Sequence, residues 1–176
     1  LKWPNDVIAQ GAKGCGILAQ LVPESGSTEG QRSIIVGIGQ NTNMSAEQLP
    51  VPTATSLRLC TGHTVDSTEV LERLLVAFAR RYRAFLRAGG GPEAADPLTG
   101  APSLLDAARA VCSTLGAEVT MSLPDGSVVR GVAEDMDAQG RILIRREDGT
   151  LAPYAVGDIE HLRPANGSYG DFCPAH

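Results

Sequence analysis

Hydrophobic residues near the start of the chain fall into two short runs of strand type. Residues 15–22 and 32–38 are rich in apolar and β-branched side chains, and a segment containing Gly, Ser and Glu separates them at 23–31. This pattern predicts two neighbouring antiparallel strands. The polar segment 41–52, with prolines at 50 and 52, predicts a loop without regular structure.

The apolar positions change to helical spacing after residue 66. Asp66 and Glu69 form a capping pattern and glycines occupy 89–91, so a long helix is predicted between them. A linker rich in Gly, Pro and Ala at 89–102 and a second, shorter helix at 103–115 are predicted next. The apolar side chains of the long helix are Val70, Leu71, Leu74, Leu75, Phe78, Tyr82 and Phe85.

Short strands replace helices from Ala117 onward, separated by turn residues that end in Gly at 126, 140 and 149. Five short strands within about 50 residues predict a small closed β-barrel. The tail at 165–176 contains Gly, Ser, Pro and isolated aromatics, and we expect it to be disordered or loosely attached. The predicted strands are 118–123, 128–133, 141–146, 151–156 and 159–162.

Composition limits the classes of protein that fit this chain. Its 176 residues are 43% hydrophobic and 20% charged, as in a soluble globular protein of one or two domains. The net charge of -5 argues against nonspecific nucleic-acid binding, and no apolar run is long enough to cross a membrane. The 4 cysteines lack the spacing of zinc ligands, so free thiols in a reducing cytoplasm are expected.

Several polar and charged residues directly precede the first predicted strand in the sequence. Pro4 fixes its own φ and disfavours helical backbone at Trp3. The backbone before Asn5 and Asp6 is therefore restricted, and we expect the directions of these two side chains to be restricted as well. Lys13 follows shortly after them. Taken one at a time, these residues are explained more simply by a surface turn, but together they indicate a site.

The order of four short motifs resembles that of biotin protein ligases. The resemblance implies an ATP-dependent ligase that uses Mg²⁺ to form biotinyl-AMP and then transfers biotin to a lysine of a biotin carboxyl carrier protein. The third motif begins like a dinucleotide fingerprint but lacks the third glycine and the following helix, so a nicotinamide cofactor is not expected. The motifs are Lys-Trp-Pro-Asn-Asp-Val at 2–7, Lys-x-x-Gly-Ile-Leu at 13–18, Val-Gly-Ile-Gly-Gln-Asn-Thr-Asn at 36–43 and Ala-Thr-Ser-Leu at 54–57.

The resemblance also implies roles for individual residues. Lys13 would contact the biotin carboxylate and the ATP phosphate, and so offset the repulsion between the two anions. Asp6 would either hold Mg²⁺ or orient and deprotonate the acceptor lysine, and the sequence leaves both roles open. Asn41 would bind adenine through its amide. Asn5 and Trp3 would line the nucleotide side, although Trp3 would serve equally well as a core anchor.

Two residues of the second motif complete the predicted substrate site. Gly16 and Ile17 would lie against the substrate, since a glycine lets backbone approach a ligand closely. Close packing of neighbouring strands is an alternative reason for the glycine.

The implied fold is α+β. Residues 1–116 would form part of a class II synthetase-like catalytic domain, with a mixed or antiparallel sheet and helices, and 117–164 an SH3-like β-barrel followed by a tail at 165–176. In the family, a Gly- and Arg-rich segment lies upstream of these motifs. We therefore expect this chain to be the C-terminal part of an enzyme and to be inactive by itself.

The implied partners are a carrier protein and, through the sheet, a second copy of the chain. Arginines at the end of the long helix would contact an acidic carrier domain, but a solvated helix end that matches the macrodipole explains them more simply. A noncatalytic binding or assembly module is the alternative to a ligase. A lipoate ligase is disfavoured by the Lys-Trp-Pro-Asn-Asp motif. The arginines are Arg80, Arg81, Arg83 and Arg87.

Overall fold

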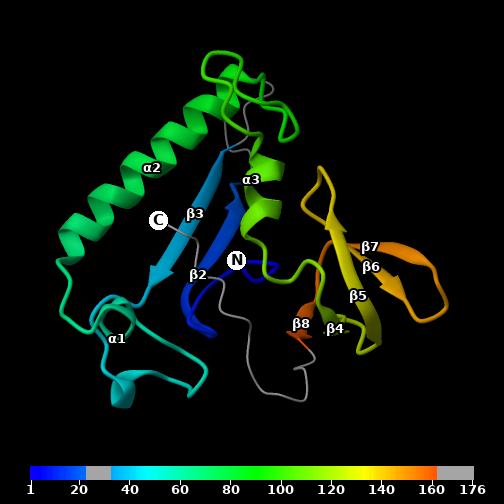
Figure 1. Cartoon of the computed structure of the whole chain (residues 1–176), viewed down its shortest axis with the longest axis horizontal. Coiled ribbons are helices and arrows are strands. Elements are labelled where there is room, and N and C mark those ends of the chain that lie inside the picture. The colour runs from blue at the N-terminus through cyan, green and yellow to red at the C-terminus, as the bar shows by residue number, and fades with distance from the viewer. Residues whose placement is uncertain (23–32, 162–176) are drawn as a thin grey trace. The chain divides into compact units, whose positions relative to one another are not determined.

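The computed structural model describes residues 1–22 and 33–161, and the chain forms two compact units (Figure 1). One unit is Asn5–Val65, and the other combines Leu1–Pro4 with the chain from Asp66 onward. The domain boundary predicted between 116 and 117 was placed where the sequence pattern changes from helices to strands. It falls within the second of these two units, and it stays a prediction. The predicted loop at 23–31 and the predicted tail at 165–176 lie outside the described residues.

The first unit is built on a three-stranded antiparallel sheet in the order β1-β2-β3. Its strands are β1 (Asp6–Ala9), β2 (Ala12–Leu21) and β3 (Ile34–Gln40), so the predicted pairing of the two apolar runs is confirmed. The strand β1 was not expected from the sequence pattern. It joins β2 through a tight hairpin whose two turn residues, Gln10 and Gly11, have φ of 50° and 75°.

The predicted loop at 41–52 contains the 3₁₀ turn η1 (Ala46–Gln48), so the expectation that it lacks regular structure is wrong in part. The short helix α1 (Leu57–Thr61) follows this loop and was not predicted from the sequence. Ser56 caps α1 by accepting a hydrogen bond from the backbone N–H of Leu59, and Gly62 ends α1 in a left-handed conformation with φ of 78°.

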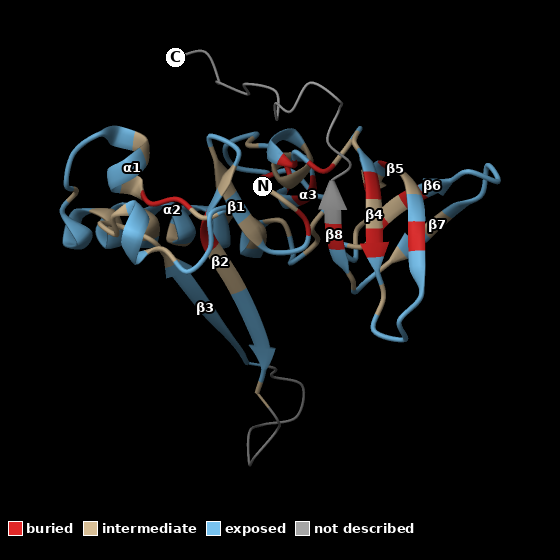
Figure 2. Cartoon of the chain, turned by 90° about the horizontal axis from the view of Figure 1, so that it is seen from below, coloured by how far each residue is buried: buried red, intermediate tan, exposed pale blue. Residues whose placement is uncertain are grey.

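The predicted long helix is confirmed as α2 (Ser67–Arg87). Asp66 caps it through the backbone N–H of Thr68, whereas Glu69 pairs with Arg73 one turn along the helix. No residue of α2 is buried, and its ribbon carries no red in Figure 2. The predicted second helix is α3 (Leu104–Val111), capped by Ser103. No helix within the described part of the chain is long and apolar enough to span a membrane.

The second unit contains a five-stranded antiparallel sheet in the order β7-β6-β5-β4-β8, so the five short strands predicted from Ala117 onward are confirmed. Among the described residues, β7 and β8 are the edges of its hydrogen-bonded ladder. Buried side chains gather on β4, β5 and β6 (Figure 2). The strands are β4 (Glu118–Ser122), β5 (Val128–Met136), β6 (Ile142–Arg146), β7 (Leu151–Tyr154) and β8 (Asp158–His161).

Candidate functional site

Lys13 and Asp6 form an ion pair across the β1–β2 hairpin. The Nζ atom of Lys13 lies 2.6 Å from Oδ1 of Asp6, and the two side chains are 50% and 19% exposed. Oδ1 is itself buried and accepts no hydrogen bond from the described residues, so the ammonium holds it by charge rather than by an aligned N–H. The two residues predicted to carry the chemistry therefore lie in direct contact, with the amine partly open to solvent.

A β-bulge places Lys13 on the face of the sheet that Asp6 occupies. The register of β1 and β2 shifts between Val7 and Ile8, so that Gly14 has no partner residue of its own. In a regular strand, Lys13 and Gly16 would lie on opposite faces. Because of the extra residue they share one face, and a Cβ added at Gly16 would lie only 3.4 Å from Cε of Lys13.

The backbone of Lys13 is held on both sides. Its N–H donates to the carbonyl of Thr53 at 2.8 Å, and its own carbonyl accepts from the N–H of Thr55 at 2.8 Å. On the opposite side, Lys13 pairs with Ile8 of β1. These contacts fix the origin of a long and flexible side chain, so the ammonium has a restricted range of positions.

Asn5 and Ile17 hold the start of β1 against β2. The side-chain amide of Asn5 donates to the carbonyl of Ile17 at 2.9 Å, and the N–H of Ile17 donates to the carbonyl of Asn5 at 2.9 Å. With Gly16, these residues line part of a shallow hollow over β2 and β3. The structure thus brings three of the predicted substrate residues together.

Asn41 follows β3 directly and connects it to the segment before α1. Its side-chain amide donates to the carbonyl of Thr55 at 3.0 Å, and its backbone N–H donates to the carbonyl of the bulged Gly14 at 2.9 Å. One N–H of the amide and its oxygen have no hydrogen-bond partner among the described residues. Asn41 therefore stabilises the loop and still offers a donor and an acceptor.

Sequence analysis missed Gln40, which supports the bulge. Its side-chain amide donates to the carbonyls of Gly14 at 3.1 Å and Asn41 at 3.0 Å. Nothing in the sequence marks Gln40 except its place beside Asn41.

The fourth motif, at 54–57, has a structural role. The hydroxyl of Ser56, which is 1% exposed, donates to the carbonyl of Met44 at 2.7 Å while it caps α1.

Trp3 lies in the core of the other compact unit. Its side chain is 3% exposed, its indole N–H donates to the carbonyl of Gly140 at 2.9 Å, and its backbone N–H donates to the hydroxyl of Thr114 at 3.0 Å. It belongs to the hydrophobic cluster of the five-stranded sheet. These contacts favour the alternative left open by the sequence, a core anchor, over a place on the nucleotide side.

The thiol next to the ion pair is not activated. Cys15 is buried, and burial raises the pKa of its thiol; the negative charge of Asp6 raises it further, against a smaller opposing effect of Lys13. Cys15 therefore remains a neutral thiol near neutral pH. Within 1–22 and 33–161, no three His, Cys, Asp or Glu side chains gather where they could hold a metal ion.

Comparison with known proteins agrees with the sequence motifs. Residues 114–162 match the family described as "Biotin protein ligase C terminal domain". The "Biotin--[acetyl-CoA-carboxylase] ligase" of Mycobacterium tuberculosis is 33% identical over 163 residues, which cover 93% of this chain and 53% of that protein. The chain corresponds to the C-terminal part of biotin protein ligases.

Solved structures extend this match to the fold. The apo biotin protein ligase from Aquifex aeolicus superposes with a TM-score of 0.68 at 26% identity, over 93% of this chain and 65% of that one. The same Aquifex enzyme in complex with biotin and ATP gives a TM-score of 0.66 at 25% identity, over 93% and 62%. The predicted α+β fold with an SH3-like C-terminal domain is confirmed. The chain spans about half to two thirds of the length of these relatives.

Proposed function

We propose that the protein represented by this chain is an ATP-dependent biotin protein ligase. It would activate biotin as biotinyl-5′-AMP and transfer it to a specific lysine of a biotin carboxyl carrier protein. The contact of Lys13 with Asp6 beside Gly16 carries the proposal, because it sets one partly exposed ammonium in a held position. The similarity to a ligase solved with biotin and ATP supplies the substrates.

Lys13 would act in the first step. An oxygen of the biotin carboxylate attacks the α-phosphorus of ATP, and the bond to pyrophosphate breaks. Both reacting groups are anionic, so an ammonium between them lowers their repulsion and stabilises the charge that builds up at phosphorus. Before substrates bind, the carboxylate of Asp6 keeps the Lys13 side chain oriented.

Asp6 has two roles that fit its position. In the second step the acceptor lysine must be a neutral amine when it attacks the acyl carbon and displaces AMP, and a carboxylate at the site can accept its proton. Alternatively, Mg²⁺ takes one or two protein carboxylates beside substrate phosphates, and the buried Oδ1 of Asp6, which accepts no hydrogen bond, fits such a single ligand. Bound there, Mg²⁺ would neutralise phosphate charge.

The remaining predicted residues would position substrates. One N–H of the Asn41 side-chain amide donates to Thr55, and the other N–H and the amide oxygen would serve as donor and acceptor to adenine. Gly16 and Ile17, in the hollow that Asn5 lines, would receive the biotin side of the adenylate through backbone contacts. Homodimerisation through the sheet and a cytoplasmic location remain predictions from the sequence.

The test measures the two half-reactions of the complete parent protein. We expect Lys13→Ala to lose most of the burst of biotinyl-AMP formation, by about a hundredfold, since a charged contact made in the transition state is removed. Lys2→Ala is the matched control, because Lys2 is the other lysine of the chain and belongs to the other compact unit. An unchanged burst in Lys13→Ala would contradict the role of Lys13. A wild-type protein that forms no biotinyl-AMP would favour a noncatalytic module.

A further inference from the structure

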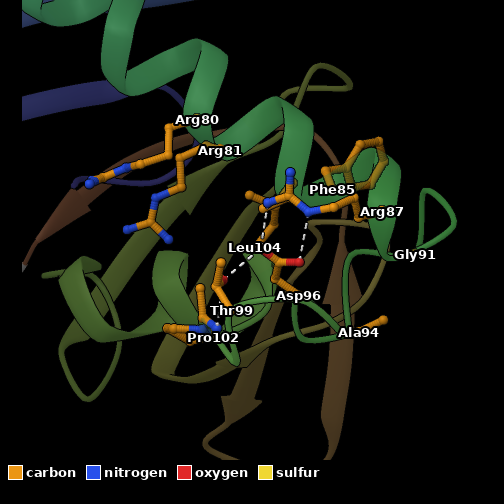
Figure 3. A pocket seen from close by; sticks show the side chains of 12 residues that line it. Arg80, Arg81, Phe85, Arg87, Gly91, Ala94, Asp96, Thr99, Pro102 and Leu104 are labelled. Carbon is orange, nitrogen blue, oxygen red and sulfur yellow. Dashed lines mark hydrogen bonds and ion pairs between the residues drawn. The ribbon is translucent and has the colours of Figure 1, made fainter.

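A pocket of about 370 Å³ lies at the C-terminal end of α2 (Figure 3). The last turns of α2, the segment from Gly91 to Pro102 and the start of α3 line it. All of these lining residues belong to the compact unit that contains the chain from Asp66 onward. Lys13 and Asp6 belong to the unit Asn5–Val65. Neither Lys13 nor Asp6 is among the residues that line the pocket.

One wall of the pocket is held in place by an ion pair. Arg87 donates from Nε to Oδ1 of Asp96 at 2.9 Å, and the Asp96 side chain is 1% exposed. Asp96 also accepts hydrogen bonds from the hydroxyl of Thr99 and the backbone N–H of Leu98. The hydrogen bond from Arg87, followed by that from Thr99, holds the pKa of Asp96 well below its usual range. The segment 91–102 is thus attached to the end of α2.

Two other arginines of the pocket have no such partner. Arg80 and Arg81 are exposed, and neither forms an ion pair or a hydrogen bond within the described residues. Figure 3 shows both guanidinium groups apart from the Arg87–Asp96 pair. The surface beside them is mostly apolar and includes Phe85 and Leu104. The pocket therefore combines positive charge at its margin with an apolar interior.

We infer that this pocket docks an acidic segment of the carrier protein that receives biotin, with carboxylates on Arg80 and Arg81 and an apolar side chain against Phe85. The inference rests on the proposed function, which requires a protein substrate. A guanidinium pairs well with a carboxylate, and a site of this size holds one or two side chains. The apolar interior and the buried carboxylate of Asp96 suit such a segment better than a phosphate, whose charge is greater.

The charge of the whole chain supports an acidic partner at this place. The net charge is -5, so the chain as a whole repels an acidic protein. Arg80, Arg81 and Arg87 of the pocket lie within the last turns of α2, and of these three only Arg87 is neutralised by a carboxylate among the described residues. A local positive region on an acidic protein favours one docking orientation and speeds its formation.

The experiment measures the dissociation constant of the complete ligase for the unbiotinylated carrier domain of the same organism. Arg81→Glu is compared with Arg83→Glu, which makes the same change of charge on the same helix at a residue outside the pocket. We expect Arg81→Glu to weaken binding about tenfold and Arg83→Glu less than about twofold. Arg81→Gln, a milder change, should weaken binding as well, and circular dichroism checks that each variant is folded.

Four results would overturn the inference. Three are equal weakening by Arg81→Glu and Arg83→Glu, unchanged binding in Arg81→Glu, and wild-type binding that does not weaken as the salt concentration rises. The fourth is competition by inorganic phosphate at concentrations where acetate has no effect, which would identify the pocket as a phosphate site instead. Formation of biotinyl-AMP by the same proteins without carrier tests the proposed function separately, so failure of one is distinguishable from failure of the other.

Discussion

Gly16 lies directly beside the end of the Lys13 side chain that contacts Asp6. A Cβ added at Gly16 would lie 3.4 Å from Cε and 3.5 Å from Nζ of Lys13, and 3.9 Å from Oδ1 of Asp6. Gly16 pairs with Asp6 across the two strands. A single methyl group would therefore be in van der Waals contact with both side chains, and a larger, branched side chain would occupy the space next to the ion pair.

Gly16→Val should separate Lys13 from Asp6 while preserving the strand, because β-branched residues favour extended backbone. We expect kcat/KM for biotinyl-AMP formation to fall by about tenfold or more, and Gly16→Ala to have a smaller effect. Gly37→Ala is the control, because the nearest atom to its added Cβ is the Leu18 carbonyl oxygen at 3.8 Å, an ordinary contact. Equal losses in Gly16→Ala and Gly37→Ala would mean that the sheet, rather than Lys13, is affected.

The Lys13–Asp6 contact should appear as coupling between the two residues. Residues in direct contact show non-additive effects when they are changed together. We expect the double variant Asp6→Asn with Lys13→Ala to be hardly slower in biotinyl-AMP formation than Lys13→Ala alone, because the ammonium that Asp6 orients is already absent. The measurement is kcat/KM for wild type, both single variants and the double variant. Additive losses would show that Asp6 acts independently of Lys13 in this step.

Most regular elements could be predicted from the sequence, because each of these has a clear periodicity. Alternating or continuous apolar runs indicated β2, β3 and the five later strands, and the Asp66 cap with its apolar stripe indicated α2. The strand β1 could not be recognised, because it has only four residues and overlaps the polar motif at 2–7. The motifs also placed Asp6 and Lys13 in one predicted site, and the structure brings the two side chains into contact.

The geometry of the site could not be predicted, because it depends on a bulge. One extra residue in β2, Gly14, decides which face Lys13 occupies, and no sequence pattern reports it. Gln40 supports this bulge through a side chain that resembles any polar residue at a strand end. The pocket at the end of α2 depends on Asp96, nine residues beyond Arg87 in a segment without periodicity.

Trp3 should contribute to stability rather than to nucleotide binding. Its buried indole and the hydrogen bond to Gly140 predict that Trp3→Ala lowers the free energy of unfolding by roughly 3–5 kcal/mol. Trp3→Phe keeps much of the packing but loses the N–H donor, so a smaller loss is expected. Urea denaturation measures both losses. Circular dichroism follows the unfolding, because each variant removes the single tryptophan of the chain and therefore its tryptophan fluorescence. A large rise in KM for ATP in Trp3→Phe without a change in stability would instead support the nucleotide role.

Asp96 should make stability depend on pH in the acid range. Its folded-state pKa is lowered, chiefly by the hydrogen bond from Arg87, so the stabilisation is fully present above the unfolded pKa of about 3.9 and is lost as the pH falls toward the folded value. Asp96→Asn should therefore lower Tm at pH 7, and the difference from wild type should shrink below about pH 4.

Asp106→Asn is the matched control for Asp96→Asn. Asp106 lies 3.6 Å from Arg109 and its side chain is 61% exposed, so water screens the pair and its removal should change Tm little. Thermal unfolding of the three proteins at several pH values measures both effects. A Tm difference for Asp96→Asn that stays constant from neutral to strongly acid pH would show that lost packing, rather than the carboxylate charge, accounts for the instability. The attachment of segment 91–102 to α2 would then not depend on the ion pair with Arg87.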